Sequence, residues 1–200
     1  MREISLHILD VAENGITAGA SCIQIVVEEA RAENVLKIVI RDNGRGISSE
    51  KIDRITDPFV TTRTTRRVGL GLSLLEAAAR RCDGEAKIES EPGAGTEVTA
   101  VFRYNHIDRA PIGDMAGSIT TLIAGNPDVD FIYDHSVDDR HFGMDTREIR
   151  KELEDSFLAD PAVIYHLAQT IRKHLNRLDQ GQMNSEMGEE GNGKIDDRRS

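Results

Sequence analysis

Three short segments of this sequence carry side chains suited to holding a nucleotide and its metal ion. Asn14 follows Asp10 by four positions, a carboxylate among glycines lies at Asp42-Asn-Gly-Arg-Gly46, and a glycine pair lies at Gly69-Leu-Gly-Leu72. A neutral amide oxygen is a good ligand for Mg²⁺, and glycines let a backbone approach a ligand closely. Each segment alone is common, but in this order they predict an ATP pocket.

Asp10 and Asn14 are predicted to lie on one face of a helix, because residues four apart are neighbours at about 6 Å. A carboxylate at Asp10 would then stand beside a metal-bound phosphate, where it could act as a general base. Glu13 points about 100° away from Asn14 and is the poorer candidate. Taken alone, Asn14 fits an exposed helical asparagine better, and His7 on the same stripe fits a surface or boundary histidine.

Asp42 follows a run of β-branched residues, so its side chain can project from a strand end into a crevice. A buried carboxylate needs a hydrogen-bond donor, and adenine offers an exocyclic amine where guanine offers a carbonyl. Gly44 and Gly46 would let the backbone approach the base. Ile47 could pack against its ring, and Thr96 could add a contact through water. Alone, this segment also fits a hairpin turn, since Asn-Gly after an apolar run is typical of one, and Thr96 fits an ordinary strand residue.

Gly69 and Gly71 come at the start of a predicted helix, whose exposed N–H groups and positive end favour phosphate oxygens. The loop before them is rich in arginine, and on closing it could bring the Arg66 guanidinium onto the γ-phosphate. Without the neighbouring glycines, the same loop would fit a solvated basic segment. Its arginines are Arg63, Arg66 and Arg67.

The spacing of apolar residues predicts the elements that position these groups. Helices are expected over residues 2–19, 49–56, 69–81 and 112–124, with a short one opened by Asp145 and a longer one from Asp160 to about Leu178. Strands are expected around residues 23–28, at Val35–Ile40, Ala86–Ser90 and Thr96–Phe102, and in a hairpin formed by Val129–Tyr133 and a segment near His141–Met144. The polar residues from Gln180 onward predict a disordered tail.

Composition sets the class of protein. A hydrophobic content of 38% in 200 residues supports a packed core, and a net charge of −10 argues against nucleic acid or an anionic membrane as partner. No stretch is apolar enough to cross a membrane and no signal pattern begins the chain, so we expect a cytoplasmic protein. Cys22 and Cys82 stand alone in the sequence and fit buried thiols better than a disulfide or a metal site.

Together these segments resemble the motifs of the GHKL (Bergerat-fold) ATPases, the superfamily of DNA gyrase, heat-shock chaperone ATPases, sensor histidine kinases and mismatch-repair ATPases. The resemblance spans roughly residues 1–103. Leu9–Ala20 resembles the N box, Asp42-Asn-Gly-Arg-Gly46 the first glycine box, Asp57-Pro-Phe59 the F-box segment, Gly69-Leu-Gly-Leu72 the second glycine box and Gly93-Ala-Gly-Thr96 the last box.

The resemblance implies an α/β two-layer sandwich, with a mixed sheet covered on one face by three helices and Mg-ATP bound under a mobile lid of residues 57–71. It implies that Asn14 is the Mg²⁺ ligand and that Asp42 reads adenine. Asp10 stands where several branches carry glutamate, and its shorter side chain puts base catalysis in question. The further nucleotide contacts that it implies are Ala18, Gly69, Leu70, Gly71 and Leu72.

We divide the chain into an ATPase domain, residues 1–106, a small C-terminal α/β module of unknown role, residues 107–178, and an acidic disordered tail, residues 179–200. The module carries His135 and His141 among aspartates, a set that fits a solvated hairpin tip better than a metal site.

Two functions are compatible with these features. The first is a stand-alone protein kinase, of the histidine-kinase or serine-kinase (anti-sigma) type, or a slow ATPase. No phosphoacceptor-histidine helix precedes the N box, so the acceptor is expected on a partner protein. The second is an ATP-gated binding module with little turnover, one that could serve a hydrogenase or NADH-linked electron-transfer complex. The sequence leaves homodimerisation open.

Overall fold

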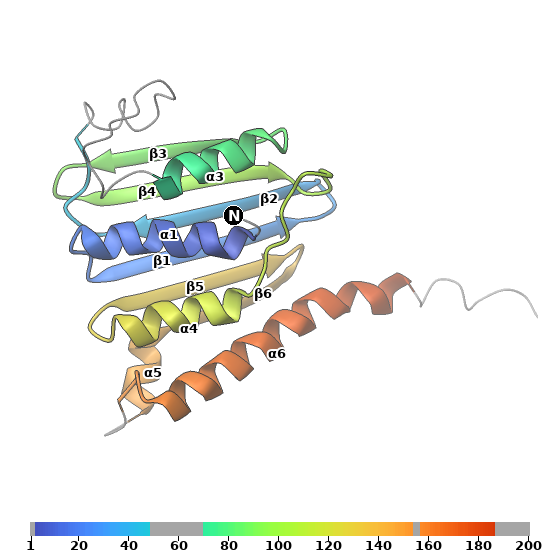
Figure 1. Ribbon diagram of the computed structural model, residues 1–200. Coiled ribbons are helices and arrows are strands. Elements are labelled where there is room, and N and C mark those ends of the chain that lie inside the picture. Colours follow the sequence, from blue (N-terminus) through green and yellow to red (C-terminus); the bar gives the residue numbers. More distant parts are fainter. Residues whose placement is uncertain (1–2, 49–69, 154–156, 187–200) are drawn as a thin grey trace, which may run out of the picture.

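The computed structural model describes residues 3–48, 70–153 and 157–186, and its strands form one six-stranded sheet in the order β3-β4-β2-β1-β5-β6 (Figure 1). The strands are β1 (Cys22–Ala30), β2 (Val35–Asp42), β3 (Glu85–Glu91), β4 (Gly95–Arg103), β5 (Asp130–Val137) and β6 (Arg140–Asp145). The helices are α1 (Ile4–Thr17), α3 (Leu70–Arg80), α4 (Met115–Gly125), α5 (Thr146–Glu152) and α6 (Pro161–Glu186). The predicted helix over residues 49–56 and the arginine loop lie outside the described residues.

The sheet is mixed, because β1 pairs in parallel with β5 whereas every other neighbouring pair is antiparallel. Along β1 buried and half-buried residues alternate strictly, which is the period-two pattern of a strand with one covered face. Helices α1, α3 and α4 lie on that face, and α6 packs across α4, β5 and β6 on the same side (Figure 1). The predicted α/β class, with a mixed sheet covered on one face by helices, is confirmed.

An aliphatic core fills the space between the sheet and these helices. The sheet contributes Ile23, Ile25, Val27, Ile38 and Ile40, and the helices contribute Ile4, Ile8, Val11, Leu75, Ile119 and Ile123. Both cysteines are free; Cys82 is buried and Cys22 is partly exposed. Among the residues with a described structure, no helix combines the length and the apolar character needed to span a membrane.

The C-terminal segment continues the same sheet, since β5 lies directly against β1 and β6 follows at the edge. The same segment also holds the start of α1: the N–H groups of Ile4 and Ser5 donate to the carbonyls of Pro111 and Ile112 at 3.0 and 2.8 Å. These are two of the N–H groups that a helix leaves without an internal partner. The sheet is therefore continuous across the predicted domain boundary at residue 106.

Helix α6 is longer than predicted. It continues past Leu178 to Glu186, so residues 179–186 are helical and their assignment to a disordered tail is wrong. The physical reason is that glutamine, methionine and glutamate are good helix formers, and each residue added to an existing helix costs little once the helix is nucleated. Residues 187–200 lie outside the described part of the chain.

A buried carboxylate joins β1 to β5 at the end of the sheet opposite Asp42. Glu29 is 5% exposed, and its Oε1 contacts His135 Nε2 at 2.9 Å. Its Oε2 accepts from the guanidinium of Arg31 and from the Tyr104 hydroxyl, each at 3.0 Å. Burial raises the pKa of Glu29, but the hydrogen bonds from His135, Arg31 and Tyr104 outweigh it, so the pKa is lowered overall.

This network reaches the C-terminal helix. Arg31 also donates to Asp179 of α6 at 2.6 Å, and His135 contacts the hydroxyl of the buried Tyr133 at 2.6 Å. Hydrogen bonds to buried ionised groups stabilise a fold only when every partner is present. The Glu29 network therefore couples β1, β5 and α6.

His7 is buried, with 2% of its surface exposed, and its prediction as a surface or boundary histidine is wrong. It lies three residues after Ile4 and four before Val11, in the middle of the apolar stripe of α1. Its Nδ1 is buried and makes no hydrogen bond in the described part of the structure. Burial is the main reason that the pKa of His7 is lowered from its ordinary value of 6.5.

We expect the free energy of unfolding to fall when the pH drops below 6.5, because the unfolded chain then binds a proton at His7 more readily than the folded chain does. At higher pH neither state is protonated there, so the loss is absent. His7→Leu should flatten this part of the pH dependence, measured by urea unfolding at about pH 7.5 and about pH 5.5. His166→Leu, at an exposed position of α6, is the control. An unchanged pH dependence in His7→Leu would contradict the assignment.

Candidate functional site

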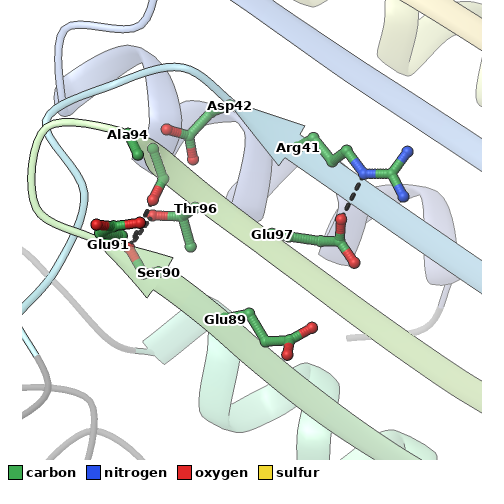
Figure 2. Close-up of a pocket in the computed structure, with 9 residues that line it drawn as sticks. Arg41, Asp42, Glu89, Ser90, Glu91, Ala94, Thr96 and Glu97 are labelled. Carbon is green, nitrogen blue, oxygen red and sulfur yellow. Dashed lines mark hydrogen bonds and ion pairs between the residues drawn. The ribbon is translucent and has the colours of Figure 1, made fainter.

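Three polar side chains lie in one row at the end of the sheet. Asp42 ends β2 and pairs with Thr96 of β4, which in turn pairs with Ser90 of β3. Cross-strand partners project from the same face of a sheet, and this row follows Ile38 and Ile40, which face the helices. Figure 2 shows Asp42, Thr96 and Ser90 close together at the strand ends. The row therefore continues the buried face of the sheet with hydrogen-bonding groups.

The Asp42 carboxylate is held by backbone donors. Its Oδ1 accepts from the Gly44 N–H at 2.9 Å, and the Thr96 N–H also donates to the carboxylate. Burial raises the pKa of Asp42, and these two hydrogen bonds oppose the rise without cancelling it. A fixed and partly dehydrated carboxylate of this kind is suited to accept a hydrogen bond from a ligand N–H group.

Two glycines let other segments approach Asp42. A Cβ at Gly15, in α1, would lie 2.8 Å from the Asp42 Cβ. Gly95 has a φ of +107°, and a Cβ there would lie 1.9 Å from the Asp42 carbonyl oxygen. Our sequence reasoning missed Gly15, although a glycine inside a helix costs about 1 kcal/mol relative to alanine and so indicates a close contact. Its neighbour Asn14 is thereby brought to the Asp42 end of the sheet.

The glycine segment after Asp42 is held between α1 and the β3–β4 turn. A Cβ at Gly44 would lie 3.0 Å from the Ala18 Cβ, and the Arg45 N–H donates to the Ala18 carbonyl at 3.1 Å. On the other side, Gly46 has a φ of +66° and comes so close to Glu91 that a Cβ would lie 2.0 Å from its carbonyl oxygen. In this structure the two glycines allow close contacts within the protein, Gly44 with Ala18 and Gly46 with Glu91.

The hairpin interpretation of the Asn-Gly pair is wrong. Asn43 Oδ1 accepts from the N–H groups of Ser21 and Cys22 at 2.9 Å each, and β2 pairs with β1 and β4 on its two sides. The asparagine therefore fastens the end of β2 to the start of β1. A local turn signal cannot distinguish these outcomes, because the hydrogen-bond partners lie about twenty residues away.

Asp10 lies against the first turn of α3. A Cβ at Gly71 would lie 2.9 Å from the Asp10 Cβ, so glycine is what permits this approach. The first-turn N–H groups of a helix lack internal partners and favour anions. Asp10 and Asn14 are both half-exposed, with Asn14 one turn further along α1 toward Asp42. The C-terminal half of α1 therefore runs from the start of α3 to the Asp42 row.

Other predicted contacts are placed differently or lie outside the described residues. Leu72 is 5% exposed and belongs to the hydrophobic core, so only its backbone could take part in a phosphate cradle. Leu70 begins α3, and nothing further is described of its side chain. Gly69 and Arg66 lie outside the described residues, as does most of the predicted lid. Ile47 is described, and its N–H donates to the Ser90 hydroxyl at 2.8 Å.

A hollow of about 410 Å³ lies at the ends of β2, β3 and β4 (Figure 2). Its lining includes Arg41, Glu89 and Glu97 beside the row of Asp42, Thr96 and Ser90. Strand alternation directs the first three toward the uncovered face, where Arg41 and Glu97 form an ion pair. Because Asp10 and Asn14 belong to α1, on the covered face, the candidate nucleotide site lies on the helix side of this hollow.

Residues 2–106 match the family model described as histidine kinase-, DNA gyrase B-, and HSP90-like ATPase. The chain is 35% identical over 102 residues to the histidine protein kinase DivJ of Caulobacter vibrioides, covering 49% of this chain and 17% of that protein. It is 37% identical over 92 residues to sporulation kinase D of Bacillus subtilis, covering 46% of this chain and 18% of that protein. The chain therefore spans less than a fifth of the length of these relatives.

Among solved structures, the chain is similar to the Aquifex aeolicus MutL ATPase domain complexed with ADP. The TM-score is 0.46 at 12% sequence identity, and the match covers 72% of this chain and 63% of that one.

Proposed function

Because the chain belongs to the family of histidine kinase-, DNA gyrase B- and HSP90-like ATPases, we propose that it binds ATP along α1, between the Asp42 row and the first turn of α3. The observation that carries this proposal is the position of the C-terminal half of α1, where Gly15 packs against Asp42 and Asp10 packs against Gly71. Asn14 lies between these two contacts. The base would lie at Asp42 and Thr96, and the phosphates at the start of α3.

One side chain of this arrangement, that of Asn14, is suited to bind Mg²⁺. Asn14 is half-exposed on α1, next to Gly15, which packs against Asp42, and its amide oxygen is a hard, neutral ligand of the type that Mg²⁺ accepts. When bound, the ion would neutralise charge on the phosphate oxygens. The first-turn N–H groups of α3 would hold further phosphate oxygens.

We propose that the bound nucleotide serves phosphoryl transfer to a partner protein. In that step the bond between the γ-phosphorus and its bridging oxygen breaks, a bond forms from phosphorus to an oxygen or nitrogen of the partner, and ADP leaves. Asp10 is positioned to take the proton that the acceptor loses. The kinases among the relatives support this reading, and Arg66 would assist at the γ-phosphate.

A second function, ATP-gated binding of a partner, is favoured by the way the C-terminal segment joins α1. The carbonyls of Pro111 and Ile112 hold the first turn of the helix that carries Asp10 and Asn14, and α4 packs directly on that helix. A displacement of α1 on nucleotide binding would therefore be transmitted to α4 and α6. A partner docked there, such as an electron-transfer subunit, would respond to the nucleotide without turnover.

Variants of α1 test these roles. Asn14→Ala should weaken ATP binding about tenfold or more in the presence of Mg²⁺, and much less in its absence, because one metal ligand is lost. Asp10→Asn should keep the affinity within about threefold but lose transfer, because the base is lost while the shape is kept. Affinity is measured by calorimetry, and transfer with γ-labelled ATP and candidate partner proteins.

Glu13→Gln is the matched control, since Glu13 is exposed beside Asn14 and points elsewhere. It should change neither quantity. Label on a partner that disappears in Asp10→Asn supports the kinase, whereas tight binding without label or phosphate release supports the gated module. If Asn14→Ala leaves the affinity for Mg-ATP unchanged, the proposed metal ligand is wrong.

A further inference from the structure

Ser90 of β3 connects the glycine segment to the Asp42 row, and sequence reasoning gave it no role. Its hydroxyl accepts from the Ile47 N–H at 2.8 Å. It also lies 2.8 Å from the Gly95 carbonyl oxygen and 2.8 Å from the Thr96 hydroxyl. The hydroxyl of Ser90 therefore has three hydrogen-bond partners, and only one of them is itself a hydroxyl.

Counting protons assigns the direction of each hydrogen bond. A serine hydroxyl donates one proton and accepts two. The Ile47 N–H can only donate and the Gly95 carbonyl can only accept, so the Ser90 proton goes to Gly95. The Thr96 hydroxyl must then donate to the second lone pair of Ser90. The opposite assignment would leave two oxygen lone pairs facing each other at 2.8 Å between Ser90 and Gly95.

The Thr96 hydroxyl consequently has no proton left for a ligand. Toward the site it offers only lone pairs, as the Asp42 carboxylate does. An exocyclic amine has two N–H groups and can donate directly to two acceptors. A base that carries a carbonyl in place of this amine would face two acceptors, and its oxygen would have no hydrogen-bond donor.

We propose that Ser90 is a positioning residue for base selection. Because the Thr96 hydroxyl donates its proton to Ser90, Thr96 and Asp42 can only accept hydrogen bonds from the base. The site therefore favours a base with an exocyclic amine. This inference rests on the proposed nucleotide function. Ser90 touches neither the base nor the phosphates in this arrangement and acts through Thr96. Without Ser90, the Thr96 hydroxyl can rotate and donate to a carbonyl.

The test compares ATP with inosine triphosphate, in which a carbonyl replaces the amine, by calorimetry on the full chain. In Ser90→Ala the preference for ATP should fall about five- to tenfold, the value of one redirected hydrogen bond. Thr96→Val should lower the preference similarly, and the double variant should lose no more than the larger single loss, because both act through one hydroxyl. Ser90→Thr keeps a hydroxyl at this position and should retain the preference of the unmodified chain for ATP.

Thr99→Val, on the same strand but on the uncovered face, is the control and should leave the preference unchanged. A purely structural role for Ser90 would weaken both nucleotides equally and leave their ratio intact, which would overturn the inference. If Ser90→Ala does not fold, Ser90→Cys keeps the volume while weakening the acceptor, and the same ratio decides. If the unmodified chain binds neither nucleotide, the proposed function itself fails, which is a distinct result.

Discussion

Replacing Asp42 with alanine should lower the affinity for ATP on the order of 100-fold, because a hydrogen bond to a charged group contributes about 1.5–3 kcal/mol and the ligand donor would be left unpaired. The N–H groups of Gly44 and Thr96 would also lose their shared acceptor. Calorimetry on the purified variant gives the affinity. Thermal unfolding of the same sample shows whether the sheet end is retained.

Asp134→Ala is the matched control for this experiment. Asp134 is a half-buried carboxylate of β5, on the uncovered face of the sheet, where it contacts His141 at 3.2 Å. Its removal should leave ATP affinity within about twofold. Equal losses in the two variants would mean that Asp42 affects binding only through overall stability, and the base would then have to lie elsewhere.

Removing the Glu29 carboxylate should cause a large fall in the free energy of unfolding. Glu29→Ala leaves Arg31, His135 and Tyr104 without their common acceptor, and breaking a buried charge pair costs about 3–5 kcal/mol. Because its folded pKa lies below the ordinary value of 4.5, this stabilisation is complete above that pH and is lost as the pH falls through the folded pKa. Urea unfolding at neutral pH measures the change.

The neighbouring Glu28 provides the control. It lies on the opposite face of β1, with 44% of its side chain exposed, and pairs only with Lys37 among the ion pairs of the described residues, at 3.2 Å. Glu28→Ala should cost less than about 1 kcal/mol, as exposed ion pairs do. If the two variants unfold at the same urea concentration, the Glu29 network contributes nothing beyond surface charge.

Much of the fold is predictable from local pattern. The alternation around Ile23, Ile25 and Val27 and the apolar run Val35–Ile40 predict β1 and β2, and the structure confirms both. The hairpin of β5 and β6 and the capped start of α5 at Asp145 were also predicted and are confirmed. These features depend on residues close in sequence, where side-chain period and capping chemistry decide the outcome. The motif order likewise indicated the family that residues 2–106 match.

Part of the site also follows from sequence alone. Asp42 at a strand end, with Asp10 and Asn14 one turn apart on a helix, can be placed because strand and helix geometry are regular. The glycines could be assigned to close approaches, but not to a particular neighbour. Gly71 contacts Asp10 and Gly44 contacts Ala18, and neither partner is near in the sequence.

The remaining features depend on how distant segments pack. Ser90 reaches Ile47 across 43 residues, and Glu29 reaches His135 across 106. Both contacts follow from strand register, and a shift of one residue would turn either side chain to the other face. The sequence by itself indicated most of the elements, the family and the candidate nucleotide-binding residues. Only the tertiary structure decided which of them meet, because the pairings of β1 with β5 and of β2 with β4 join segments that are far apart in the sequence.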